Sequence, residues 1–308
     1  MGSVPLPALV VGLLLGLALG ASSAAGEASA RLRVVTFNLL HGGPASGLSG
    51  DDQHLDQRLA LVSRELRELA PDVVGLQESS ITRRRNVAAR LAGELGLYWA
   101  HASATRRVSR IGILDRLIVW AMNFEEGPAV LSRWPIVETE VYDLPRCVKF
   151  YDPRVVLRAA LETPRGRLQV YSAHTAHDAC QVRRLGEIVR AHAGALPALI
   201  MGDFNAAEST EWMQALVRDG GLVDTFRAAN PETLGPTTWQ RPEAPDPTVS
   251  RRIDYIFVLP GRATAARVRS SRVILSTPGR LANGVTLWPS DHYGVVADLA
   301  LDAAEARR

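Results

Sequence analysis

Short apolar runs and amphipathic segments succeed one another along most of the chain. Alternating or uninterrupted apolar and β-branched residues are typical of half-buried and fully buried strands, whereas apolar residues three and four positions apart are typical of one face of a helix. These patterns predict strands at 31–37, 73–76, 117–121, 129–133, 136–144, 154–162, 167–174, 198–201, 252–259, 267–275 and 294–301, and helices at 56–69, 82–95, 178–193 and 209–218.

The order of these elements indicates the fold class. Strands and helices alternate in the first part of the chain, and strands cluster in the middle. This order favours an α/β fold with mixed sheets over a purely parallel sheet. The segments 106–116 and 222–249 are predicted to be mostly loop. No Gly-, Ser- or Pro-rich boundary and no repeat divides residues 31–308, which we therefore expect to form one domain.

The first 30 residues differ from the rest. An apolar run from Ala8 to Leu19 is followed by small residues and by Ala28-Ser29-Ala30. This pattern predicts a secretory signal peptide over residues 1–30, and hence a secreted, periplasmic or cell-surface protein. No Lys or Arg precedes the apolar run. A misplaced start and an uncleaved anchor are therefore the alternatives.

The chain has two cysteines, Cys147 and Cys180. The predicted strands 154–162 and 167–174 are joined by the turn 163–166, and one-for-one opposition in an antiparallel pair keeps the paired residue numbers near a constant sum. Both cysteines lie just beyond the open end of this hairpin, on opposite chains. In an exported protein this position favours a disulfide over two buried free thiols.

Polar residues of a few chemical types stand at the ends of the predicted strands. Carboxylates are suited to Mg²⁺, which takes oxygen ligands and polarises phosphoryl oxygens. A histidine paired with a carboxylate can activate water, while carboxamides and imidazolium groups can stabilise charge on phosphate oxygens. The set therefore indicates metal-assisted hydrolysis of a phosphate ester. Its members are Asn38, Glu78, His174, Asp203, Asn205, Asp254, Asp291 and His292.

Taken singly, these residues have ordinary structural alternatives. Asp203 and Asn205 suit a β-turn, and Asp254 could pair with Arg251 or Arg252. A lone histidine is more often a hydrogen-bonded structural residue than a catalyst. These structural alternatives are weakened because every one of these strand ends carries a residue of the type that metal-assisted phosphate-ester hydrolysis requires.

Six strings occur in order along the chain: Thr36-Phe37-Asn38, Leu76-Gln77-Glu78, His174, Gly202-Asp203-Phe204-Asn205, Arg252-Ile253-Asp254-Tyr255-Ile256 and Ser290-Asp291-His292. Together they resemble the signature of the endonuclease/exonuclease/phosphatase superfamily, which has the deoxyribonuclease-I-like fold. One such string is a weak signal, whereas six in order are specific. The resemblance implies a four-layer sandwich in which two mixed sheets pack face to face between helices.

The resemblance also implies a metal centre. Glu78 would be the main ligand of Mg²⁺ or Mn²⁺, with Asn38 beside it. A second ion, if the centre holds two, would lie near Asp203, Asn205 and Asp291.

Further roles follow from the same resemblance. Asp203 would orient or deprotonate the attacking water, and Asn205 would hold a phosphate oxygen. Asp254 would pair with His292, which would bind the scissile phosphate. His174 would act on the phosphate or the leaving group.

One further carboxylate is implied more loosely. Glu126, or alternatively Glu125, falls where deoxyribonuclease-type members have a carboxylate that pairs with the histidine at position 174. His177 is a weak candidate for substrate contact because it follows His174 closely. Three further histidines, His41, His101 and His192, are expected on the surface or in loops, as His177 is.

The substrate class remains open between several readings. Abasic-site endonucleases are disfavoured, because Ser79 and Ser80 follow Glu78 and a histidine occupies position 174. The net charge of +3 suits a polyanion without requiring one. Arginines at 83–85, 106, 107 and 110 could line a nucleic-acid groove.

We therefore expect a monomeric phosphoesterase that slightly favours nucleic acid and has no obligate protein partner. Phospholipid or inositol phosphate is the alternative substrate class. Lipid binding is weakened because no stretch alternates apolar residues with turn signals, and Trp134, Trp239 and Trp288 are dispersed. A non-catalytic secreted binding module is disfavoured by the complete set of motif residues.

Overall fold

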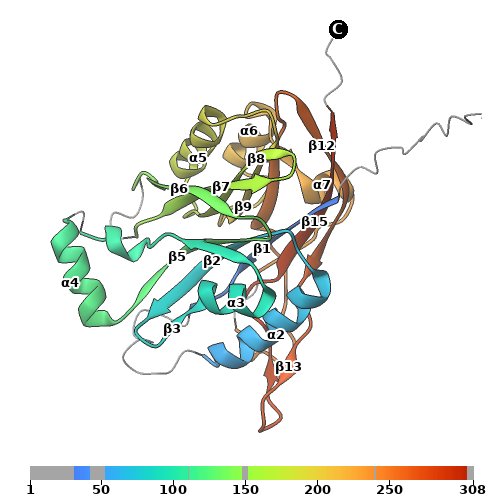
Figure 1. Cartoon of the computed structure of the whole chain (residues 1–308). Coiled ribbons are helices and arrows are strands. Elements are labelled where there is room, and N and C mark those ends of the chain that lie inside the picture. The colour runs from blue at the N-terminus through green and yellow to red at the C-terminus, as the bar shows by residue number, and fades with distance from the viewer. Residues whose placement is uncertain (1–30, 42–52, 110, 148–151, 239–240, 304–308) are drawn as a thin grey trace, which may run out of the picture.

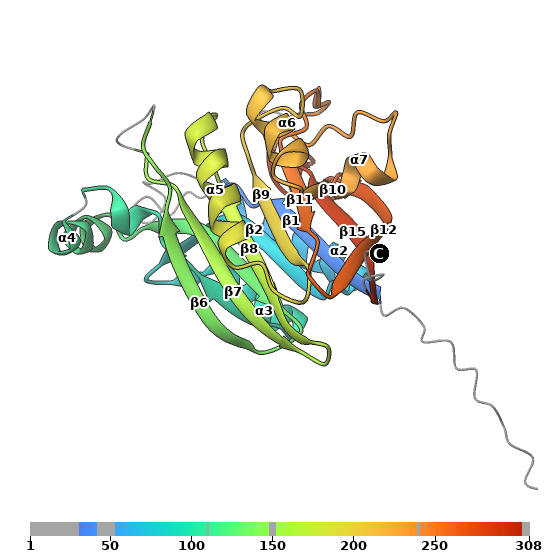
Figure 2. The ribbon, with the colours of Figure 1, turned by 90° about the horizontal axis from the view of Figure 1, so that it is seen from above.

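Two β-sheets face each other in the computed structural model, which describes residues 31–41, 53–109, 111–147, 152–238 and 241–303 (Figures 1 and 2). The first sheet has the order β12 (Thr264–Ile274), β15 (Gly294–Ala303), β1 (Arg31–Asn38), β2 (Val73–Thr82), β5 (Glu125–Ser132), β4 (Tyr98–His101), with β3 (Arg85–Asn86) beside β2. The second has the order β10 (Val223–Asp224), β11 (Asp254–Leu259), β9 (Ala198–Asp203), β8 (Gly166–His174), β7 (Val155–Thr163), β6 (Ile136–Asp143). A small ribbon pairs β13 (Gly279–Arg280) with β14 (Thr286–Leu287).

Helices cover the outer face of each sheet. The helices α2 (Leu55–Leu69) and α3 (Val87–Leu95) pack on the first sheet. The helices α5 (Ala179–Ala191) and α6 (Glu211–Arg218) pack on the second. Figure 2 shows these layers edge-on. The other helices are η1 (Thr105–Arg107), α4 (Gly112–Met122) and α7 (Thr225–Ala229). The predicted α/β class and its four layers are confirmed.

The strand pattern explains the three apolar cores. Successive side chains of a strand point to opposite faces. In β1, Val34 therefore joins the core between the sheets, while Val35 and Phe37 pack beneath α2 and α3. In β8, Val170 faces the same central core and Tyr171 faces α5. Strands buried on both sides read as continuous apolar runs, which is the pattern that the sequence shows.

Both sheets are mixed, as the sequence predicted. Strand β1 is parallel to β2 and antiparallel to β15. Strand β8 is parallel to β9, while β7 and β11 are antiparallel to their neighbours. The predicted hairpin 154–174 is confirmed, with Val156 opposite Ala173 and Thr163 opposite Gly166.

Two predicted elements were wrong in type or extent. The segment 117–121 is not a strand but part of α4, which also takes in half of the predicted loop 106–116. A short apolar run suits a helix or a strand equally well, and here no neighbouring strand pairs with it. The helix predicted from residue 82 begins at Val87, because β2 continues to Thr82 and the Asn86 side chain caps the helix by accepting the Ala89 N–H.

The segment 222–249 holds more regular structure than the predicted loop, since β10 and α7 lie within it. The predicted signal peptide, residues 1–30, lies outside the described residues. Among the residues that are described, no helix is both long and apolar enough to cross a membrane.

A disulfide joins Cys147, after β6, to Cys180 in the first turn of α5, with the two Cα atoms 6.6 Å apart. It closes a loop that spans 33 positions and contains the whole β7–β8 hairpin. The hairpin and the start of α5 are thereby held in one unit.

We predict that Cys147→Ser with Cys180→Ser will lower the free energy of unfolding by about 2–4 kcal/mol, because the closed loop restricts the unfolded chain. Urea denaturation of the variant and of the wild type, with and without reductant, measures the effect. Equal stability of oxidised and reduced wild type would contradict the prediction.

Candidate active site

Three site residues form one row across the second sheet. His174 ends β8, Asp203 ends β9 and Asp254 begins β11. His174 is the parallel partner of Asp203, and Asp254 is its antiparallel partner. Directly opposed residues of neighbouring strands point to the same face. The register therefore brings these buried side chains together, as the strand ends in the sequence predicted.

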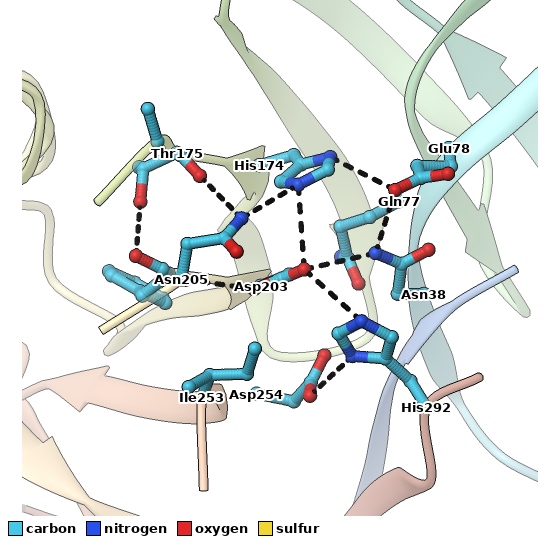
Figure 3. Close-up of polar contacts among 12 residues, drawn as sticks. Asn38, Gln77, Glu78, His174, Thr175, Asp203, Asn205, Ile253, Asp254 and His292 are labelled. Carbon is cyan, nitrogen blue, oxygen red and sulfur yellow. Dashed lines mark hydrogen bonds and ion pairs between the residues drawn. The ribbon is translucent and has the colours of Figure 1, made fainter. Parts of the chain in front are cut away.

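Asp203 is the most connected member of the row (Figure 3). Its Oδ2 atom accepts a hydrogen bond from Asn38 Nδ2 at 3.0 Å and lies 3.4 Å from His174 Nε2 and 3.7 Å from His292 Nε2. Its Oδ1 atom accepts the N–H of Asn205 at 2.8 Å. Burial raises the pKa of Asp203 to about 7, although the positive charge of His292 lowers it in part.

Asp254 holds His292 in place. The two side chains meet at 2.8 Å through His292 Nδ1 and Asp254 Oδ2, which leaves Nε2 directed at Asp203. Burial alone would lower the pKa of His292, but the charges of Asp254 and Asp203 raise it well above its ordinary value. The histidine is therefore positively charged and aimed at the centre of the site.

The structural alternative for Asp254 does not hold for Arg252. Arg252 forms ion pairs with Asp224, at 2.8 Å, and with Glu208, and its guanidinium stacks 4.5 Å from the ring centroid of Tyr255. Among the ion pairs of the described residues, the partner of Asp254 is His292 and not Arg251.

Asn205 occupies a turn that presents its side chain. Its backbone has a φ of 49°, which L-residues seldom adopt. Its Nδ2 atom donates to the backbone oxygen of Thr175 at 2.9 Å and lies 3.0 Å from His174 Nε2. The stretch is therefore a turn, as one interpretation held, and the turn directs the Asn205 side chain toward His174.

Burial gives His174 a different character from His292. It lowers the pKa of His174 well below its ordinary value, and the charges of Arg154 and His292 lower it further. His174 is therefore neutral, and its Nδ1 atom has no hydrogen-bond partner. The centre holds one charged and one neutral histidine.

Glu78 enters the site from the first sheet through a β-bulge. The pairing of β2 with β5 shifts between Leu76 and Ser79, and Glu78 has a φ of 53°. A bulge redirects a side chain out of the regular alternation. Glu78 Oε1 accepts from Asn38 Nδ2 at 3.2 Å and lies 3.9 Å from His174 Nδ1.

The implied pairing of Glu126 with His174 is not present, since no hydrogen bond or ion pair joins the two among the described residues. Glu126 lies instead in the field of Glu78, and burial together with that charge raises the pKa of Glu126 to about 7. The alternative Glu125 points away and binds Arg106 with two hydrogen bonds of 2.7 Å. Of the two glutamates, Glu126 is the one on the side of the site.

Asp291 lies at the same rim, where Ser290 donates to its carboxylate at 3.1 Å. Burial and the charge of Glu78 raise its pKa. The carboxylates of Glu126 and Asp291 thus both lie in the electrostatic field of Glu78. Carboxylate and carboxamide oxygens are the donors that hard divalent cations take. These residues therefore fit a divalent metal ion.

A second group of possible donors lies deeper. One ligand atom each from Asp203, Asp254 and His292 lie within 4.8 Å of one another. His292 Nδ1 is already hydrogen-bonded to Asp254 Oδ2. The group is therefore a hydrogen-bonded relay as well as a possible set of metal ligands.

The sequence did not point to Arg154, which precedes β7 and contributes to the site. Its positive charge acts on both His174 and Glu126, and its buried Nε has no partner. Asp152 contacts its other end at 3.0 Å. Arg154 belongs to none of the motif strings, but it stands at the start of an antiparallel strand, which begins at the rim where its neighbour β8 ends.

His41 was also missed. It was expected in a surface loop, but its Nε2 atom lies 3.4 Å from Glu78 Oε2 and its ring packs edge-on against Phe124. His177 stays close to the site, with Nδ1 2.8 Å from the backbone oxygen of Asn205. The positions of His41 and His177 depend on the conformation of loops, and the periodic pattern of apolar residues does not predict that conformation.

A cleft of about 960 Å³ opens beside Arg154. Six arginines and two aspartates are among its lining residues. Part of this charge is already paired, because Arg106 binds Glu125 and Arg107 lies 3.3 Å from Asp143. The arginines are Arg106, Arg107, Arg116, Arg146, Arg154 and Arg184.

Solved structures share this fold. An endonuclease/exonuclease/phosphatase family protein from Bacteroides thetaiotaomicron has a TM-score of 0.67 and 20% identity over 89% of this chain and 96% of its own. The mannosyl-6-phosphatase Bt3783 of the same organism has a TM-score of 0.65 and 20% identity, over 87% and 99%. The human nocturnin catalytic domain, with bound sulfate, has a TM-score of 0.62 and 20% identity, over 88% and 95%.

Curated proteins include no match to this sequence. The model of the endonuclease/exonuclease/phosphatase family matches residues 35–292, which include every residue of the row and its surroundings. The chain therefore belongs to the endonuclease/exonuclease/phosphatase family, whose members are metal-dependent phosphoester hydrolases.

Proposed function

We propose that the chain is an exported phosphodiesterase that depends on Mg²⁺ or Mn²⁺, with residues 31–308 as its catalytic domain. The observation that carries the proposal is the row of His174, Asp203 and Asp254, faced by His292 and by the Asn38–Glu78 pair. This is a buried set of acid, base and oxygen-donor groups at one rim of two sheets.

Glu78 and Asn38 would hold the metal ion, and Asp203, Asn205 and Asp291 are the candidates for a second. A bound ion would withdraw charge from the phosphoryl oxygens and stabilise the leaving oxygen. The carboxylates whose pKa values are raised by burial and by Glu78 would then be held in their charged form.

The protein's own groups supply the remaining chemistry. His292, charged and oriented by Asp254, would donate a hydrogen bond to a phosphate oxygen. Asp203 would orient the attacking water and accept its proton, and Asn205 would donate to another phosphate oxygen. His174, being neutral, would hydrogen-bond the phosphate or the leaving group at the far side of Asp203.

Export is supported by two features. The leader predicted at residues 1–30 has a signal-peptide pattern. The disulfide between Cys147 and Cys180 is of a kind that persists in oxidising compartments. We propose that the mature protein is a monomer that acts outside the cytosol.

Three substrate classes are supported by separate observations. The arginine-lined cleft beside Arg154 supports an anionic substrate such as nucleic acid, which the sequence slightly favoured. An exposed apolar helix on the wall of the same cleft supports a phospholipid as the second candidate. A phosphate monoester is a third, because one similar structure is named as a mannosyl-6-phosphatase.

We predict hydrolysis of bis-p-nitrophenyl phosphate with Mg²⁺ or Mn²⁺, and its loss in EDTA. A panel of plasmid DNA, RNA, phosphatidylglycerol, sphingomyelin and inositol phosphates then identifies the natural substrate class. Activity that persists in EDTA, or the absence of any phosphodiester hydrolysis with metal, would contradict the proposed function.

Asp254→Asn is expected to lower kcat roughly 10²–10⁴-fold, because His292 loses the carboxylate that orients and charges it. His292→Ala should cost about as much, and the double variant little more, since the two residues act as a unit. Asp219→Asn, at an exposed aspartate after α6, is the matched control. Additive losses in the double variant would show that the pair does not act together.

Arg154→Ala is expected to lower kcat/KM roughly 10–100-fold through the loss of a charge-assisted hydrogen bond to phosphate. Arg154→Lys should recover part of it, because Lys keeps the charge without the forked geometry. Arg267→Ala removes an exposed arginine of β12 and serves as control. Unchanged kinetics in Arg154→Ala would remove Arg154 from the site.

A further inference from the structure

The helix α4 turns its apolar side to solvent. Ile113 is 70% exposed, Leu117 57% and Trp120 69%, and Leu114 beside them is 42% exposed. The spacing of the first three places them on one face of the helix. The only buried residue of α4 is an aspartate, Asp115. This is the reverse of the usual surface helix, which buries its apolar stripe.

Polar contacts hold α4 in this orientation. Asp115 accepts the backbone N–H of Ser109 at 2.7 Å. At the other end, Arg83 donates to the backbone oxygen of Trp120 at 2.8 Å, and Asn123 accepts the backbone N–H of Arg83 at 2.7 Å. The helix projects from the side of the molecule in both views (Figures 1 and 2). Its apolar face is therefore fixed outward by contacts at both ends.

Arginines border this apolar face. Arg83 and Arg84 are exposed beside it, and the guanidinium of Arg83 lies 5.6 Å from the ring centroid of Trp120. Arg116 is an exposed residue of the helix itself. The carboxylates that line the pockets beside the helix are paired or buried, since Asp115 is buried, Asp143 pairs with Arg107 and Glu125 pairs with Arg106. An apolar face bordered by arginines matches the interface of an anionic bilayer, where apolar tips enter the acyl region and cations meet phosphates.

The same helix forms a wall of the cleft beside the catalytic centre. Gly112, Asp115 and Arg116 line the cleft from α4, and Arg154, the residue before β7, lines it as well. The charge of Arg154 acts on His174. A surface that rests on α4 would therefore present its phosphates close to a basic cleft that shares Arg154 with the catalytic centre.

We propose that α4 is an interfacial helix that docks the enzyme on a bilayer containing anionic phospholipid, and that the cleft receives a lipid headgroup phosphate. The docking stands on the exposed face alone, whereas hydrolysis of the headgroup rests on the proposed phosphodiesterase function.

Trp120 is a built-in reporter for the test. The chain has six tryptophans, and none lies in residues 1–30, so an apolar leader cannot give its signal. Protein purified from an exporting host, with Mg²⁺, is mixed with vesicles of phosphatidylcholine and phosphatidylglycerol that carry brominated acyl chains. We expect quenching of fluorescence that is lost in Trp120→Phe, and that weakens in pure phosphatidylcholine and in high salt.

The triple variant Ile113→Ser, Leu117→Ser, Trp120→Ser should bind these vesicles at least tenfold more weakly. Val137→Ser with Leu234→Ser, which removes exposed apolar side chains elsewhere, should bind as the wild type does. All variants should hydrolyse bis-p-nitrophenyl phosphate equally. Only release of headgroup from vesicles should fall with binding in the triple variant.

The outcomes separate the two proposals. Wild type that hydrolyses the soluble diester but shows no Trp120-dependent quenching would overturn the docking of α4 and leave the phosphodiesterase intact. Vesicle binding without any diester hydrolysis would overturn the function and leave the docking. Self-association of the wild type that the triple variant abolishes, without vesicle binding, would assign α4 to an interface between copies and would also overturn the docking.

Discussion

One buried carboxylate, that of Asp203, sets the requirement that the rest of the site meets. Removing a charge from water is costly unless it is hydrogen-bonded and paired. Asp203 is surrounded by partners from different elements: Asn38 from the first sheet, His174 from the neighbouring strand and His292 from the segment before β15. The two sheets must therefore hold one relative position for this carboxylate to be stabilised.

Close packing between the sheets makes that position specific. A Cβ atom on Gly75 in the first sheet would lie 2.5 Å from the Cβ of Met201 in the second. Both residues lie within strands that carry site residues, Glu78 in β2 and Asp203 in β9. Below the site, Gln77 donates to Ser172 across the two sheets at 3.2 Å. Glu78 and Asn205 keep their strained backbone conformations, with positive φ angles, because the packed structure around them holds both residues in place.

Most of the fold and the main residues of the candidate site could be predicted from the sequence, and the reason is physical. Strands buried on both faces give strong apolar runs, and a polar residue at either end of such a run stands out, as Asp203 does at the end of β9 and Asp254 at the start of β11. What depends on tertiary position was not readable. The apolar run in α4 fits two periodicities, its exposure is set by contacts of Asp115, and the position of Glu126 relative to His174 depends on how β5 meets the bulge in β2.

The arginines of the cleft bear on the choice between substrate classes. A long polyanion gains affinity from many unpaired cations along a groove. Here Arg106, Arg107, Arg154 and Arg184 each meet a carboxylate, so most of the positive charge along the cleft is compensated and what is left is local. A single headgroup phosphate needs only such a local charge, provided that another surface supplies the binding energy. The outward apolar face of α4 is a surface of that kind, and other residues of the same helix, Gly112, Asp115 and Arg116, line the cleft. The paired arginines and the exposed helix therefore argue together for a lipid phosphate over a nucleic-acid strand.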